Sequence, residues 1–119
     1  MKVLVDTPVW SIVLRRPDRP ENAIVVNQFG ALIDDGLIAL IGPVRQELLS
    51  GIKEKAQFEH IRAELRGFLD IDMTLNDYET AAAFYNACRS RGIQGSATDF
   101  LICAVAVRHD LASVLYQCN

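Results

Sequence analysis

Short, uninterrupted hydrophobic runs recur along this chain and are separated by longer segments with helical periodicity. The clearest runs cover residues 3–5 and 37–41, and short strands are also predicted over 68–73 and 114–116. Continuous hydrophobic character, as opposed to strict alternation, is typical of strands that are covered on both faces of a parallel sheet. The pattern therefore predicts four short strands.

The segments between these runs predict helices, because their hydrophobic residues recur three and four positions apart. Thr7 and Pro8 are typical of a helix start, with Thr7 as N-cap and Pro8 as the first helical residue. Thr74 and Asp77 indicate a capping box at a later start. The first predicted helix begins at Thr7, and further helices are predicted over 23–35, 42–51, 53–68 and 74–91. The last predicted helix covers 100–107 and is capped by Ser96 or Thr98.

Strands separated by helices imply parallel pairing with right-handed crossovers. We therefore expect an α/β fold, with a parallel β-sheet flanked by α-helices, in a single domain over residues 1–119. In such sheets the binding crevice lies beyond the carboxyl ends of the strands. Candidate functional residues are accordingly sought just after the predicted strands.

Composition narrows the class of protein. Half of the residues are hydrophobic and 23% are charged, which is enough for one packed core. The net charge of −3 argues against a broadly basic surface. It does not argue against nucleic acid, because a carboxylate site counts as negative until a metal ion neutralises it.

Cysteine usage and hydropathy predict a cytoplasmic protein. The three cysteines show neither a metal-binding nor a disulfide spacing, which fits a reducing compartment. The first ten residues lack the hydrophobic region of a signal peptide. No hydrophobic segment reaches the roughly 20 residues that cross a bilayer, so no membrane association is expected.

Three carboxylates stand out by their place relative to the predicted strands. Asp6 directly follows the first strand, Glu47 lies one turn into the helix after the second, and Asp99 lies in the first turn of a helix that is hydrophobic nearly all round. Each also has an ordinary explanation. Asp6 can cap a helix, Glu47 can be a solvated surface residue, and Asp99 can interact with the helix dipole.

If the three carboxylates converge at the carboxyl edge of the sheet, they repel one another and need a cation. Ligand sets made only of oxygen select Mg²⁺ or Mn²⁺ over zinc. Such a cation activates water for in-line attack on a phosphodiester and stabilises the leaving oxygen. The three acids therefore suggest metal-dependent phosphodiester hydrolysis.

The strings VDTPVW, GPVRQELLSGI and GSATDFLICAVAVRHDL resemble the three acidic motifs of PIN-domain proteins, specifically the VapC-type toxins of toxin–antitoxin pairs. The resemblance covers essentially the whole chain and implies a PIN-like, Rossmann-like fold. It implies that Asp6, Glu47 and Asp99 are the catalytic residues and the Mg²⁺ or Mn²⁺ ligands of an endoribonuclease that cleaves RNA. Thr7 and Thr98 match the hydroxyl residues beside the first and third acids, and are predicted to support the site.

The resemblance also implies partners and one departure. It implies a VapB-like antitoxin that blocks the site, and a homodimer or a toxin–antitoxin hetero-oligomer. Family members usually carry a fourth acid after the last strand, about where this chain has Asn119. A C-terminally shortened PIN domain is thus expected, without the final edge strand and helix. The alternative to an active toxin is a catalytically weakened PIN module that acts through antitoxin or partner binding.

Two further interpretations concern single residues. Asp6 could belong to the acidic pair of a phosphotransfer receiver, but a receiver needs a lysine after a late strand, and the chain has none beyond Lys55. Trp10, one turn into the first helix, is predicted to lie in the core or on a dimer surface and not to stack on RNA bases.

Overall fold

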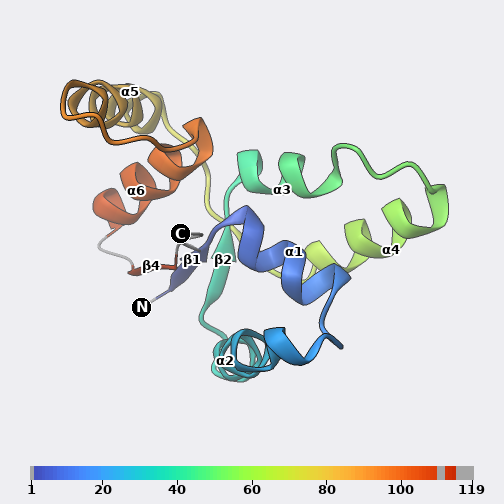
Figure 1. The fold of residues 1–119 in the computed structure, drawn as a ribbon. Coiled ribbons are helices and arrows are strands. Elements are labelled where there is room, and N and C mark those ends of the chain that lie inside the picture. Colours follow the sequence, from blue (N-terminus) through green and yellow to red (C-terminus); the bar gives the residue numbers. More distant parts are fainter. Residues whose placement is uncertain (1, 110–111, 115–119) are drawn as a thin grey trace.

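The computed structural model describes residues 2–109 and 112–114, and Figure 1 shows how their elements are arranged. A single sheet has the strand order β3-β2-β1-β4, and every paired neighbour is parallel. The predicted α/β fold with a parallel sheet is therefore confirmed. The described strands are β1 (Val3–Val5), β2 (Ile38–Leu40), β3 (Leu69–Asp70) and β4 (Ala112–Val114).

Helices cover both faces of this sheet. In Figure 1, α1 and α4 lie on one side of the central strands and α6 lies on the other, beside α5. Helix α6 contacts both β1 and β4, and α5 packs along α6. The described helices are α1 (Thr7–Arg15), the 3₁₀-helix η1 (Pro20–Asn22), α2 (Ala23–Asp34), α3 (Gly42–Leu49), α4 (Lys55–Leu65), α5 (Leu75–Ser90) and α6 (Ala97–His109).

Trp10 lies at the centre of the core. It has no exposed surface, and its ring makes edge-to-face contacts with Phe29 and Phe68, each at 4.9 Å between ring centroids. All residues of β1 and β2 are buried around it, as their continuous hydrophobic character predicts. The prediction that Trp10 packs in the core is confirmed, and its ring is not accessible for base stacking.

The ends of most elements agree with the sequence pattern within a few residues. Helix α2 stops before Gly36, as predicted, because Gly36 adopts a positive φ of 65° and the Leu37 N–H donates to the Leu32 carbonyl at 3.0 Å. The last strand begins two residues earlier than predicted. Its register is set by pairing with β1, in which Val5 lies opposite Val114, and the predicted strand residue Tyr116 lies outside the described residues.

None of the helices within the described ranges is long and apolar enough to cross a membrane.

Candidate acidic site

The carboxyl ends of β1 and β2 meet at one edge of the sheet, and the predicted acids lie in the segments that follow. The chain moves from β1 through β2 to β3 on one side, and β4 pairs with β1 on the other side. This reversal of strand order is where open α/β sheets form their binding crevice. Asp6 directly follows β1 and is therefore located at the reversal.

The Glu47 carboxylate is held between two threonine hydroxyls from different elements. Thr7 at the start of α1 donates through Oγ1 to Glu47 Oε2 at 2.7 Å. Thr98 at the start of α6 donates through Oγ1 to Glu47 Oε1. Thr7 follows Asp6 and Thr98 precedes Asp99, so this bridge draws the three acidic segments together. Thr7 and Thr98, which the sequence predicts to support the site, are thus hydrogen-bond partners of Glu47.

Asp6 is the buried acid of the group, with 2% of its surface exposed. It is the N-cap of α1, and its Oδ1 accepts from the Val9 N–H at 3.3 Å. The prediction that Thr7 is the N-cap is therefore wrong. Asp6 keeps the extended backbone of the strand end, so Thr7 becomes the first helical residue and its hydroxyl can reach Glu47.

Asp99 takes part in the start of α6. Its Oδ2 accepts from the Ser96 N–H at 3.1 Å, while the Asp99 N–H donates to Ser96 Oγ at 3.1 Å. This reciprocal pair is a capping box with aspartate in the third helical position. Of the two predicted caps, Ser96 is confirmed, whereas Thr98 uses its hydroxyl for Glu47.

The donor types suit a hard divalent cation, because carboxylate and hydroxyl oxygens are the ligands that Mg²⁺ and Mn²⁺ prefer. The carboxylates themselves are engaged locally: Asp6 and Asp99 accept from helix N–H groups, and Glu47 accepts from hydroxyls. In the part of the chain that the structure describes, no three His, Cys, Asp or Glu side chains lie close enough to hold one ion. Asn119, near which the family resemblance predicts a fourth acid, lies outside the described residues.

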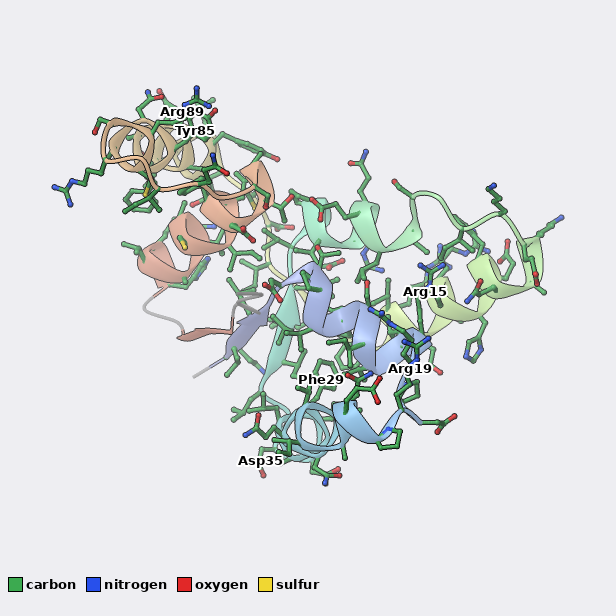
Figure 2. The ribbon with its side chains drawn as sticks, in the orientation of Figure 1. Arg15, Arg19, Phe29, Asp35, Tyr85 and Arg89 are labelled. Atoms are coloured by element: carbon green, nitrogen blue, oxygen red, sulfur yellow. The ribbon has the colours of Figure 1, made fainter. Side chains whose placement is uncertain are left out.

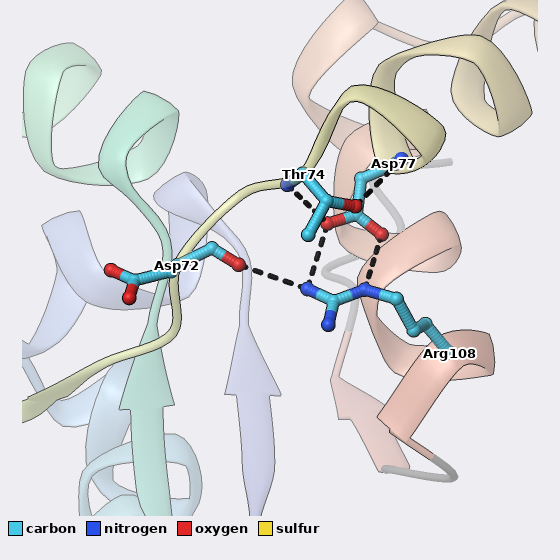
Figure 3. A network of polar contacts seen from close by, with 4 residues as sticks. All are labelled: Asp72, Thr74, Asp77 and Arg108. Carbon is cyan, nitrogen blue, oxygen red and sulfur yellow. Dashed lines mark hydrogen bonds and ion pairs between the residues drawn. The ribbon is translucent and has the colours of Figure 1, made fainter.

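Sequence reasoning missed a second polar network, which Figure 3 shows. Arg108 in the last turn of α6 binds Asp77 in the first turn of α5, and Asp77 completes the capping box with Thr74. Arg108 also donates through Nη2 to the Asp72 carbonyl at 2.9 Å. The Thr74–Asp77 capping box was predicted from the spacing of these residues and is confirmed, whereas the Arg108–Asp77 pair, 31 positions apart, leaves no local signal in the sequence. This network links α5 to α6.

The chain belongs to the PIN domain family. The model of that family, described as the PIN domain, matches residues 3–117. No curated protein is similar enough in sequence to count as a match.

Solved structures share this fold. A toxin–antitoxin complex from Klebsiella pneumoniae aligns with a TM-score of 0.73 at 19% identity, over 98% of this chain and 87% of the other. VapBC2 from Rickettsia felis, bound to a DNA fragment from its promoter, aligns with a TM-score of 0.77 at 20% identity, over 98% and 88%. FitAcB from Neisseria gonorrhoeae aligns with a TM-score of 0.65 at 22% identity, over 93% and 84%. The chain is similar in fold to all three.

Proposed function

We propose that the chain is the toxin of a type II toxin–antitoxin pair, a VapC-like endoribonuclease that depends on Mg²⁺ or Mn²⁺. One observation carries the proposal: Glu47 bridges Thr7 and Thr98, the neighbours of Asp6 and Asp99. This bridge brings together the three strand–helix segments that carry the carboxylates. Membership of the PIN domain family supports the assignment of a nuclease.

Asp6, Glu47 and Asp99 would hold the cation, and Thr7 and Thr98 are positioning residues. When bound, the cation activates water and stabilises the leaving oxygen of the phosphodiester. The two hydroxyl groups fix the rotamer of Glu47, as hydrogen bonds to metal-binding carboxylates commonly do. The helix N-termini that carry Asp6 and Asp99 add positive potential, which favours an anionic substrate at this edge.

RNA cleavage by matched aspartate variants tests this proposal. Asp6→Asn and Asp99→Asn each remove a charge and keep a side-chain oxygen that can accept the helix-capping bonds. Each variant is expected to abolish Mn²⁺-dependent cleavage of total RNA while keeping the wild-type unfolding midpoint. Asp34→Asn, an exposed aspartate of α2, is the matched control and should cleave normally. Cleavage that survives in both site variants would contradict the site assignment.

We further propose that a VapB-like antitoxin is the partner of this chain, and that the chain forms a homodimer or a toxin–antitoxin hetero-oligomer. Two of the structures with the same fold are described as a toxin–antitoxin complex and as VapBC2. The test is to co-express the chain with the product of the neighbouring small reading frame. We expect the two proteins to copurify and the complex to lose RNA cleavage. If the co-expressed protein neither binds the chain nor inhibits RNA cleavage, it is not the antitoxin.

The alternative is a catalytically weakened PIN module that acts through partner binding. It is favoured by the two hydrogen bonds that Glu47 accepts, because each carboxylate oxygen already has a hydroxyl partner without a metal ion. Calorimetric titration with Mn²⁺ distinguishes the two. If the chain binds Mn²⁺ and Glu47→Gln weakens this binding, the nuclease is supported. If the chain binds its protein partner tightly but neither binds Mn²⁺ nor cleaves RNA, the catalytically weakened PIN module is supported. In both cases we propose a single PIN domain over residues 1–119, cytoplasmic in location.

A further inference from the structure

A cavity close to Asp99 is lined by two aromatic side chains and one arginine. Its volume is about 310 Å³, at the lower end of the range for small-molecule sites. It is located where the end of α5 and the following loop meet the start of α6. The lining residues are Tyr85, Arg89, Ile93, Gln94, Gly95 and Phe100.

The lining combines aromatic rings with a cation. Tyr85 and Phe100 meet edge to face, at 5.7 Å between ring centroids and an interplanar angle of 84°. The Arg89 guanidinium lies 5.7 Å from the centroid of the Tyr85 ring and donates through Nη1 to the Tyr85 hydroxyl at 3.0 Å. Figure 2 shows these two side chains next to each other on the outer part of α5. Arg89 thus stabilises the ring orientation by a cation–π contact.

The charge of the cavity favours an anion. Arg89 is the only charged residue of its lining, and within the described ranges it makes no ion pair with a carboxylate. By contrast, Arg45 and Arg108 are each paired with an aspartate. The guanidinium therefore keeps donors for a phosphate, and the Gln94 amide lies in the same cavity for a base edge.

Gly95 connects the cavity to the acidic site. Gly95 lines the cavity, and a Cβ atom on it would lie 3.8 Å from Asp99 Oδ2 and 3.1 Å from the Phe100 ring, so Asp99 is close to this part of the lining. A ligand in the cavity would accordingly be a neighbour of whatever occupies the acidic site. Single-stranded RNA offers both parts that the lining suits, a base with a flat face and a phosphate.

We propose that this cavity binds one nucleotide of single-stranded RNA beside the phosphodiester that is cleaved, with its base against Tyr85 and Phe100 and its phosphate at Arg89. The inference rests on the proposed ribonuclease function and adds to it a subsite that selects unpaired RNA. Base stacking on aromatic side chains is tolerant of sequence, so the subsite recognises single-strandedness more than a particular base.

Fluorescence anisotropy in EDTA, where cleavage is prevented, tests the subsite directly. The probe is a labelled single-stranded RNA of mixed sequence and about 12 nucleotides, within the usual site sizes of single-strand binders. Tyr85→Leu is expected to weaken binding by about fivefold or more, which is the loss of one stacked base. Arg89→Gln is expected to weaken binding and to lower the slope of log affinity against log salt by about one.

Two matched variants serve as controls. Tyr78→Leu removes an exposed tyrosine of α5 that lines the neighbouring apolar cavity but not this one, and Arg91→Gln removes an exposed arginine just beyond α5. Both should bind RNA like the wild type. Equal binding by the wild type, Tyr85→Leu and Arg89→Gln would overturn the subsite, as would a wild type that does not bind the probe.

The outcomes separate the subsite from the function on which it rests. If wild-type protein cleaves RNA with Mn²⁺ and neither cavity variant changes binding, the subsite is wrong and the ribonuclease stands. If wild-type protein binds the probe through Tyr85 and Arg89 but never cleaves RNA, the subsite stands and the nuclease is wrong. Variants that keep RNA binding but lose the protein partner would assign the cavity to that partner and overturn its use for RNA.

Discussion

Arg108 and Asp77 form a two-point ion pair across the ends of two packed helices. Arg108 Nε donates to Asp77 Oδ1 at 2.6 Å, and Nη2 donates to Oδ2 at 2.8 Å. Only 1% of Asp77 is exposed, whereas 29% of the Arg108 side chain is. Asp77 also completes the N-terminal cap of α5 with Thr74. One buried carboxylate therefore both starts α5 and fastens it to α6, the helix that carries Thr98 and Asp99.

Removing Asp77 is expected to destabilise the fold. Asp77→Ala loses the capping-box bond from the Thr74 N–H and both bonds from Arg108, and we expect it to lower the unfolding free energy by about 2 kcal/mol. Asp70→Ala is the matched control, since Asp70 accepts two bonds from Arg45 but its side chain is 50% exposed. That exposed pair should contribute roughly 0–1 kcal/mol. Urea denaturation measures both, and equal losses would contradict a special role for Asp77.

The same ion pair predicts a pH dependence. The hydrogen bonds from Arg108 hold the pKa of Asp77 below its ordinary value of 3.8, against the opposing effect of burial. An acid whose pKa is lowered by folding stabilises the native state above its unfolded pKa, and this stabilisation is lost as the pH falls toward the folded pKa. The stability difference between wild type and Asp77→Asn should therefore be constant above about pH 5 and shrink below about pH 4.

Thermal unfolding of both proteins across this pH range measures the difference. Asp77→Asn keeps the size of the side chain but cannot ionise. Its unfolding therefore measures how the stability of the rest of the protein depends on pH. A stability difference that stays constant, or widens, as the solution becomes more acidic would contradict the lowered pKa of Asp77.

The strands and helices could be predicted from the sequence because local patterns determine them. Continuous hydrophobic runs located β1 and β2, and Gly36 marked the end of α2. The choice between neighbouring caps could not be predicted in the same way. Asp6 and Thr7 are both good N-cap residues, and which of them caps the helix depends on which is the last residue with the extended backbone of the strand.

The sequence predicts the members of the candidate site but not the contacts between them. Asp6, Glu47 and Asp99 are candidates because each follows a strand or lies near the start of a helix. That Glu47 joins Thr7 to Thr98 depends on side-chain directions in three elements, with 40 and 51 positions between the partners. The Arg108–Asp77 pair was missed for the same reason, because contacts between distant positions leave no periodic pattern in the sequence.

Trp10, the one tryptophan of the chain, predicts a spectroscopic result. It has no exposed surface and is packed against Phe29 and Phe68, so a soluble quencher such as acrylamide should barely reduce its fluorescence until the protein unfolds. Addition of single-stranded RNA should leave the emission spectrum unchanged. Strong quenching in the native protein, or a shift of the emission on RNA binding, would contradict the burial of this side chain.

A substitution at Thr98 tests how much its hydrogen bond to Glu47 contributes to the proposed Mn²⁺-dependent cleavage. Thr98 is 7% exposed, and Thr98→Val keeps its shape while removing the hydroxyl that Glu47 Oε1 accepts from. Partners that orient metal-binding groups typically contribute 10–100-fold in metal affinity or activity. We therefore expect Thr98→Val to raise the Mn²⁺ concentration needed for half-maximal RNA cleavage about tenfold or more. Thr98→Ser restores the hydroxyl and should recover most of that loss, because the donor to Glu47 is regained. If valine and serine variants require the same Mn²⁺ concentration as the wild type, Glu47 is not positioned through Thr98.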